Sequence, residues 1–314
     1  MIYTATGTIN ATNCGNVLMH EHIGCISNDM LHIFKQKWLD KAKLADFAVE
    51  ILGLLKTNYD VGLIVDGTPI DLGRDVLLIK EVSERSNIPI VVSTGLYHYP
   101  SMYTSGHTET EIAFWFIDEF ENGMEGTDIK PGILKAASDF GGITPDNQKR
   151  LSAMAIVQKE TNLPIYVHSA HTSNLVEKQL EILLKIIRNP EKIIIGHAAL
   201  NPNIEHLEKI LSKGCYICMD QCHCTTYSID SIGKAIAALC RRGYTDKILF
   251  SNDLCIYSDF GTRKNTGLHL SANQQADNFG YIFKVVHNSF LENGGNEKDW
   301  YKMFAKNAID ILNI

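Results

Sequence analysis

The sequence lacks an apolar run of the ~18 residues that a membrane-spanning helix needs, and its first 15 residues have no basic segment followed by an apolar stretch. It also lacks the clustered Lys and Arg that nucleic-acid binders carry. Charge is instead in acidic excess, with 36 Asp+Glu against 29 Lys+Arg. These absences predict a cytoplasmic protein that binds neither membranes nor nucleic acid.

Cysteine is sparse, with 8 residues scattered through 314, mostly among apolar neighbours. That distribution is typical of reduced thiols, and disulfides are not expected. No linker, low-complexity tract or repeat interrupts the chain. Length alone allows two domains, but the uninterrupted pattern predicts one domain over residues 1–314.

Short apolar or β-branched runs alternate with longer amphipathic stretches, which is the pattern of repeated βα units. The eight expected strands are 17–22, 62–66, 89–94, 132–137, 164–168, 192–197, 215–220 and 248–253. The expected helices are 41–57, 74–86, 108–121, 145–161, 173–188, 203–213, 231–242, 273–291 and 297–312. Eight even units predict a (β/α)₈ TIM barrel. A doubly wound open sheet is the alternative, but no Gly-rich phosphate loop follows the first strand.

Ionisable side chains gather at the carboxyl ends of the expected strands. His20 and His22 share one face of the first strand because strand residues alternate, while Glu21 faces the helical layer. The remaining strands contribute Lys135, His168, His197 and Asp253. In a barrel these positions converge on one mouth, and imidazole and carboxylate are the usual ligands of zinc-like cations.

Lys135 lies in the apolar run 132–137, where an unpaired ammonium would be costly. Burial can depress its pKa, or CO₂ can convert the amine into an anionic carbamate able to bridge two cations. A lysine paired with an acid is the remaining alternative.

The segments 19–22 (MHEH), 132–139 (GILKAASD), 164–169 (PIYVHS), 195–197 (IGH) and 250–253 (FSND) resemble the phosphotriesterase family of the amidohydrolase superfamily. Within that family the chain is more similar to the phosphotriesterase-like lactonases. The similarity runs from about residue 14 to residue 312, with the segments in the right order and spacing.

The resemblance implies a binuclear centre of two divalent ions, zinc or alternatively manganese, cobalt or iron. His20, His22 and Asp253 would bind one ion and His168 and His197 the other, with carbamylated Lys135 and a hydroxide as bridges. Asp253 would accept the proton of the bridging hydroxide and donate one to the leaving alkoxide. We also expect a homodimer, from the resemblance alone.

Substrate residues are expected on the loops at the mouth. Tyr97, with Tyr99 beside it, matches the tyrosine that contacts the substrate carbonyl in the resembling lactonases. Those lactonases carry Arg where this chain has Gln221, which argues against homoserine-lactone specificity. The segment 254–264 resembles the lactonase loop that caps the pocket, and its Arg263 and Lys264 could instead hold a phosphate.

The leading expectation is a lactonase with promiscuous phosphotriesterase activity acting on a small ester. A phosphorylated sugar-lactone hydrolase and an amide hydrolase of the same superfamily remain alternatives. A binding protein that lost catalysis is disfavoured because all six metal positions are occupied.

Overall fold

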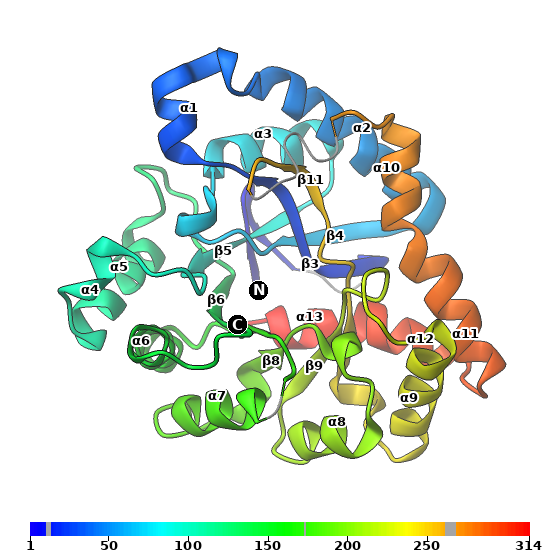
Figure 1. Cartoon of the computed structure of the whole chain (residues 1–314). Helices are drawn as coiled ribbons and strands as arrows, with labels where there is room; N and C mark the ends of the chain where they lie inside the picture. Colours follow the sequence, from blue (N-terminus) through cyan, green and yellow to red (C-terminus); the bar gives the residue numbers. More distant parts are fainter. Residues whose placement is uncertain (11–13, 173, 261–267) are drawn as a thin grey trace.

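A computed structural model describes residues 1–10, 14–172, 174–260 and 268–314. Eight parallel strands pair side by side in chain order at the centre of the molecule (Figure 1). They are β3 (Asn16–Cys25), β4 (Val61–Asp66), β5 (Ile90–Gly95), β6 (Ile133–Ser138), β7 (Ile165–Ser169), β8 (Ile193–Ile195), β9 (Tyr216–Met219) and β10 (Ile248–Phe250).

A ninth strand closes this sheet. β11 (Cys255–Ser258) pairs with β3 in parallel, directly after β10 has paired with β9. Between them, the Asp253 amide donates to the His20 carbonyl at 3.0 Å and the His22 amide to the Leu254 carbonyl at 2.9 Å. The eighth barrel strand is therefore β10 and β11 with a short break between them. The barrel prediction is confirmed, but the expectation that all of 254–264 is loop is wrong for residues 255–258.

Helices form an outer ring that follows the chain around the barrel, from blue α2 through green α7 to orange α10 (Figure 1). In chain order the helices are α1 (Asn28–Phe34), α2 (Lys41–Tyr59), α3 (Val76–Ser86), α4 (Met102–Ser105), α5 (Glu109–Asn122), α6 (Pro145–Thr161), α7 (Leu175–Leu183), α8 (Ile204–Leu211), α9 (Ile229–Arg241), α10 (Ala272–Phe279), α11 (His287–Glu292), α12 (Glu297–Tyr301) and α13 (Asn307–Leu312), of which α13 packs against the barrel interior. Across the described part of the chain, no helix combines the length and apolarity that crossing a membrane requires.

Helix starts follow local capping chemistry. The Thr144 side chain accepts a hydrogen bond from the Asn147 amide. Pro145 follows in the first turn, where backbone N–H groups have no partner within the helix, so the absence of an N–H in proline costs no hydrogen bond. The helices expected over 273–291 and 297–312 are each interrupted by a π-helical segment, η6 (Ile282–Val286) and η7 (Lys302–Lys306). Within the helix expected over 173–188, the described residues form the shorter helix α7, which ends at Leu183. The first residue of the expected helix, Ser173, lies outside the described residues.

The hydrophobic core has two layers. One lies between the strands and the helices. The other fills the barrel interior, where Val17 and Leu63 pack with Ile2 and with Ile311 of α13. An antiparallel hairpin that the sequence pattern did not reveal, β1 (Ile2–Thr4) with β2 (Gly7–Ile9), brings the N-terminus to this end. The amino end of the barrel is thus packed with side chains, and the carboxyl end is left for a site.

Candidate functional site

β3 brings two imidazoles to the barrel mouth. Its register against β4 shifts between Leu18 and Glu21, but residues 20 and 22 still share one face, as strand alternation predicts. His20 and His22 both line one cavity. Gly67, just after β4, leaves room for the first ring, since a Cβ there would lie 2.3 Å from the His20 Cδ2 atom.

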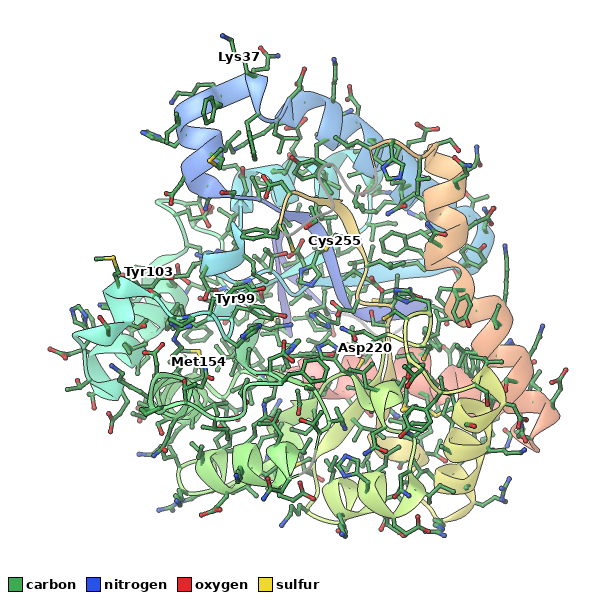
Figure 2. The ribbon with its side chains drawn as sticks, in the orientation of Figure 1. Lys37, Tyr99, Tyr103, Met154, Asp220 and Cys255 are labelled. Atoms are coloured by element: carbon green, nitrogen blue, oxygen red, sulfur yellow. The ribbon has the colours of Figure 1, made fainter. Side chains whose placement is uncertain are left out.

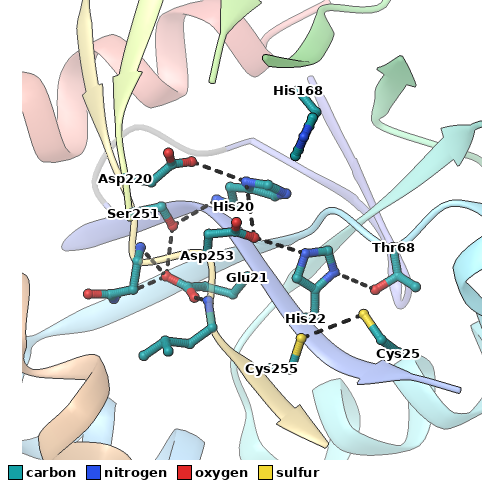
Figure 3. A network of polar contacts seen from close by, with 12 residues as sticks. His20, Glu21, His22, Cys25, Thr68, His168, Asp220, Ser251, Asp253 and Cys255 are labelled. Carbon is teal, nitrogen blue, oxygen red and sulfur yellow. Dashed lines mark hydrogen bonds and ion pairs between the residues drawn. The ribbon is translucent and has the colours of Figure 1, made fainter. Parts of the chain in front are cut away.

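Glu21, between the two histidines, faces away from the cavity and holds the chain that follows β10. Its carboxylate accepts hydrogen bonds from the Ser251 hydroxyl at 2.8 Å and the Leu254 amide at 2.8 Å. It also accepts from the backbone and side-chain N–H groups of Asn252, at 2.7 and 3.1 Å (Figure 3). Burial raises the pKa of Glu21 to about 8, against these hydrogen bonds, which lower it. Alternation indicated its direction, but nothing in the sequence indicated these partners.

Asp253 lies in the break between β10 and β11 with a left-handed φ of 62°. Its Oδ1 atom is 3.1 Å from His22 Nε2 and 3.5 Å from His20 Nδ1. Its Oδ2 atom accepts a 2.5 Å hydrogen bond from the Gln221 side chain. Burial alone would raise the pKa of Asp253, but the neighbouring imidazoles hold it well below its usual range. Gln221 therefore contacts the site through Asp253.

Asp220, which follows β9, joins two of the predicted histidines. It lies 2.8 Å from His197 Nδ1 and 3.1 Å from His20 Nδ1, and it accepts a hydrogen bond from the Tyr166 hydroxyl. A carboxylate on Nδ1 fixes the ring and leaves Nε2 as a ligand atom. Sequence reasoning missed this role, although an acid at the seventh strand tip was the available signal.

Lys135 on β6 is 1% exposed. Its Nζ atom is 2.5 Å from His20 Nε2 and 4.6 Å from the centre of the Tyr166 ring. Within the described ranges it forms no ion pair with a carboxylate, so the paired-lysine alternative is not observed. Burial lowers the pKa of Lys135, which favours the neutral amine.

His168 and His197 complete the group. The His197 Nε2 atom is 2.7 Å from His168 Nδ1. Considering the residues that the structure describes, the buried Nε2 atom of His168 has no hydrogen-bond partner, and the nearest carboxylate oxygen, of Asp139, is 3.4 Å away. Burial lowers the pKa of His168 to about 4, so this ring is a neutral, ligand-competent imidazole.

The cavity above these groups has a volume of about 210 Å³. His20, His22, Lys135, His168 and Asp253 line it, together with Cys25, Leu72, Tyr97, Tyr99, Cys255, Ser258 and Phe260. In Figure 2, Asp220 and Cys255 lie over the centre of the ring of helices, while Tyr103 lies toward its rim.

Tyr97 is held over the cavity by its backbone. Asp71 accepts a hydrogen bond from the Tyr97 amide at 2.8 Å, and the buried Arg150 guanidinium donates to the Tyr97 carbonyl at 2.7 Å. The ring centre of Tyr97 is 5.0 Å from that of His168. Burial raises the pKa of the Tyr97 phenol, so it stays a neutral hydroxyl.

The two basic residues considered for phosphate binding, Arg263 and Lys264, lie outside the described residues. Another basic residue, Arg241, donates to the Asn293 carbonyl at 3.1 Å and does not line the cavity.

The donor set fits metal ions. Two groups, His20–His22–Asp253 and His20–His197–Asp220, each place three potential ligand atoms within 4.8 Å of one another. Imidazole and carboxylate suit zinc-like cations. Within the described residues the buried His168 Nε2 atom has no hydrogen-bond partner, and a cation would satisfy it. The buried Lys135 amine, in contact with His20 Nε2, is placed to carry a carbamate. The protein thus carries a candidate metal centre at the barrel mouth, and the metal could be any of several divalent ions.

Comparison with known proteins gives the same assignment. Residues 1–312 match the Phosphotriesterase family. The chain is 33% identical over 260 residues to an aryldialkylphosphatase of Saccharolobus solfataricus, covering 82% of each chain. It is 27% identical over 309 residues to a phosphotriesterase homology protein of Escherichia coli (93% and 96% covered), and 25% identical over 297 residues to an N-acetyltaurine hydrolase of Dictyostelium discoideum (88% and 80% covered). The chain therefore belongs to the phosphotriesterase family, as a metal-dependent hydrolase.

Proposed function

We propose that this protein is a lactonase with a binuclear metal centre. His20, His22 and Asp253 would hold one divalent ion, and His168 and His197 the other. The observation that carries the proposal is that five of the six expected ligand side chains line one cavity, with the sixth, His197, in contact with His168. Zinc is the proposed metal, with manganese, cobalt or iron as alternatives.

A carbamate on Lys135 is part of the proposal. Carbamate formation needs a neutral amine, and burial lowers the pKa of this lysine. The reaction joins the amine nitrogen to the carbon of CO₂ and releases one proton. The product is an anion, and carbamylation thereby removes a buried ammonium for which the described residues supply no carboxylate in an ion pair.

Two metal ions would supply an activated water at neutral pH and polarise the substrate carbonyl. Asp253 is placed to receive a proton, because its carboxylate is ionised and lines the cavity beside His22. The same carboxyl would return the proton to the leaving alkoxide. Tyr97 offers a neutral hydroxyl that can orient the carbonyl oxygen.

The lactone assignment is supported by the resemblance of the strand-eight segment to the lactonases and by the apolar cavity walls. Leu72 and Phe260 line the cavity beside two tyrosines, which suits a neutral ring with an apolar substituent. The aryldialkylphosphatase relative supports phosphotriester cleavage as a side activity.

Amide hydrolysis is the second candidate. Relatives named N-acetyltaurine hydrolase align with most of the chain, and a centre of this kind could act on C–N bonds.

The test is a pH-indicator hydrolysis screen on protein reconstituted with metal and bicarbonate. Substrates would include short and long-chain lactones, homoserine lactones, phosphorylated sugar lactones, a phosphotriester and N-acetylated amines. We expect turnover of one lactone subclass, abolished in Lys135→Ala and retained in Lys159→Ala, a control on the exposed face of α6. Turnover of amides with no lactone hydrolysed would overturn the lactonase assignment.

A further inference from the structure

Two cysteine side chains meet in the wall of the candidate substrate cavity. Cys25 ends β3 and Cys255 begins β11, and both line the cavity. Their Sγ atoms are 3.6 Å apart (Figure 3). Cys25 is buried and Cys255 is half-buried. We call these two residues the thiol pair; neither has a role in the proposed hydrolysis.

The two cysteines are free thiols and not a disulfide. The Cys255 thiol donates a weak hydrogen bond to the Cys25 sulfur across 3.6 Å. In the β3–β11 register, Cys255 is opposite His22 and Cys25 is opposite Ser258, so the two cysteines do not face each other as directly paired residues.

The sulfur separation does fit two thiolates on one metal ion. With metal–sulfur bonds of ~2.3 Å and a tetrahedral angle, two sulfur ligands lie about 3.8 Å apart. The observed 3.6 Å needs little adjustment of either side chain. Thiolate sulfur selects soft cations over magnesium or calcium.

The thiol pair adjoins the imidazole and carboxylate group, because the Cys25 thiol makes a side-chain contact with His22. The two ring nitrogens of His22 also have other partners: Nε2 is 3.1 Å from Asp253 and Nδ1 is 2.8 Å from Thr68. Among the described residues, the groups of three or more potential metal ligands include neither cysteine. An ion between the sulfurs would therefore take its remaining ligands from water.

We propose that Cys25 and Cys255 form a binding site for a soft, thiophilic metal ion. Each thiol releases its proton to solvent and forms one metal–sulfur bond. The bound ion occupies the cavity that Tyr99 and Phe260 also line. The bound ion therefore excludes substrate from the cavity and inhibits hydrolysis, a consequence that rests on the proposed function.

Cadmium titration of zinc-loaded protein tests the site directly. We expect about one Cd²⁺ per chain with thiolate-to-cadmium absorption in the near ultraviolet, and X-ray absorption of the wild-type complex should show two sulfur ligands. Cys25→Ser and Cys255→Ser should each lose most of this absorption. Cys240→Ser should keep it, because Cys240 packs against Met303 outside the cavity.

Purely nitrogen and oxygen ligation of cadmium in the wild type would overturn the proposal, as would unchanged absorption in both serine variants. Thermal unfolding of the variants checks that they fold. The spectroscopic readout is independent of catalysis: sulfur ligation in a protein that hydrolyses no lactone would sustain the metal site and refute only the lactonase assignment.

Discussion

The buried carboxylate of Glu21 is expected to position Asp253, and Glu21→Gln tests this. Glutamine keeps the size of the side chain but replaces one carboxylate oxygen by an NH₂ group. One orientation directs this group at the Leu254 amide, now 2.8 Å from Oε2. The other directs it at the Ser251 and Asn252 donors on Oε1. Either way a buried donor loses its acceptor.

Because the pKa of Glu21 is about 8, the comparison is made near pH 9, where the carboxyl is ionised. There an unsatisfied buried donor costs about 1–3 kcal/mol, and hydrogen bonds to a charged acceptor are worth about 1.5–3 kcal/mol each. Since some bonds survive in the amide, we expect a loss of roughly 2–4 kcal/mol in the free energy of unfolding. At roughly 2 °C per kcal/mol for a chain of this size, the Tm should fall by about 4–8 °C.

Thermal unfolding with and without metal separates a general packing loss from a loss at Asp253. Metal raises the Tm by binding the folded state, and this increment should shrink in Glu21→Gln because Asp253 is less well held. The control is Glu181→Gln, on an exposed residue of α7 that pairs with Lys185; it should stay within about 0.5 kcal/mol of wild type. An unchanged Tm and an unchanged metal increment in Glu21→Gln would refute the reasoning.

Three further variants test other parts of the site. Gly67→Ala adds a methyl group that the His20 ring must avoid, so metal content after dialysis should fall; full retention would show that the ring can move freely. Asp220→Asn should weaken metal affinity by about 10–100-fold, as loss of a carboxylate behind a ligand does; chelator competition measures this, and equal affinity would contradict it. Arg150→Lys keeps the charge but not the fork that donates to the Tyr97 carbonyl. We expect a higher KM at unchanged metal content. Loss of metal would contradict this, because it would show that Arg150 supports the metal centre and not the position of Tyr97.

The sequence predicted the barrel because alternation and helical periodicity are local properties that survive folding. His20, His168 and Lys135 could be placed at one mouth for the same reason, since parallel strands all end there. The β3 register shift and the break before β11 could not be predicted, because each depends on how a strand meets its neighbour. The hydrogen-bond partners of Glu21 and Asp220 could not be predicted either, because they are distant in the sequence. The hydrogen bond from Ser251 to Glu21, for example, spans 230 positions.

The two-part eighth strand links barrel closure to the order in which the chain folds. Asp253 meets His22 across 231 residues, and its backbone is fixed only when the last strand pairs with the first. Contacts of such sequence separation form late, after the local βα units. A chain that has folded its first seven units therefore already has four histidines near the mouth but lacks the carboxylate that completes the first metal position. Tight metal binding should appear only with the final closing step, so that metal uptake reports completion of the fold.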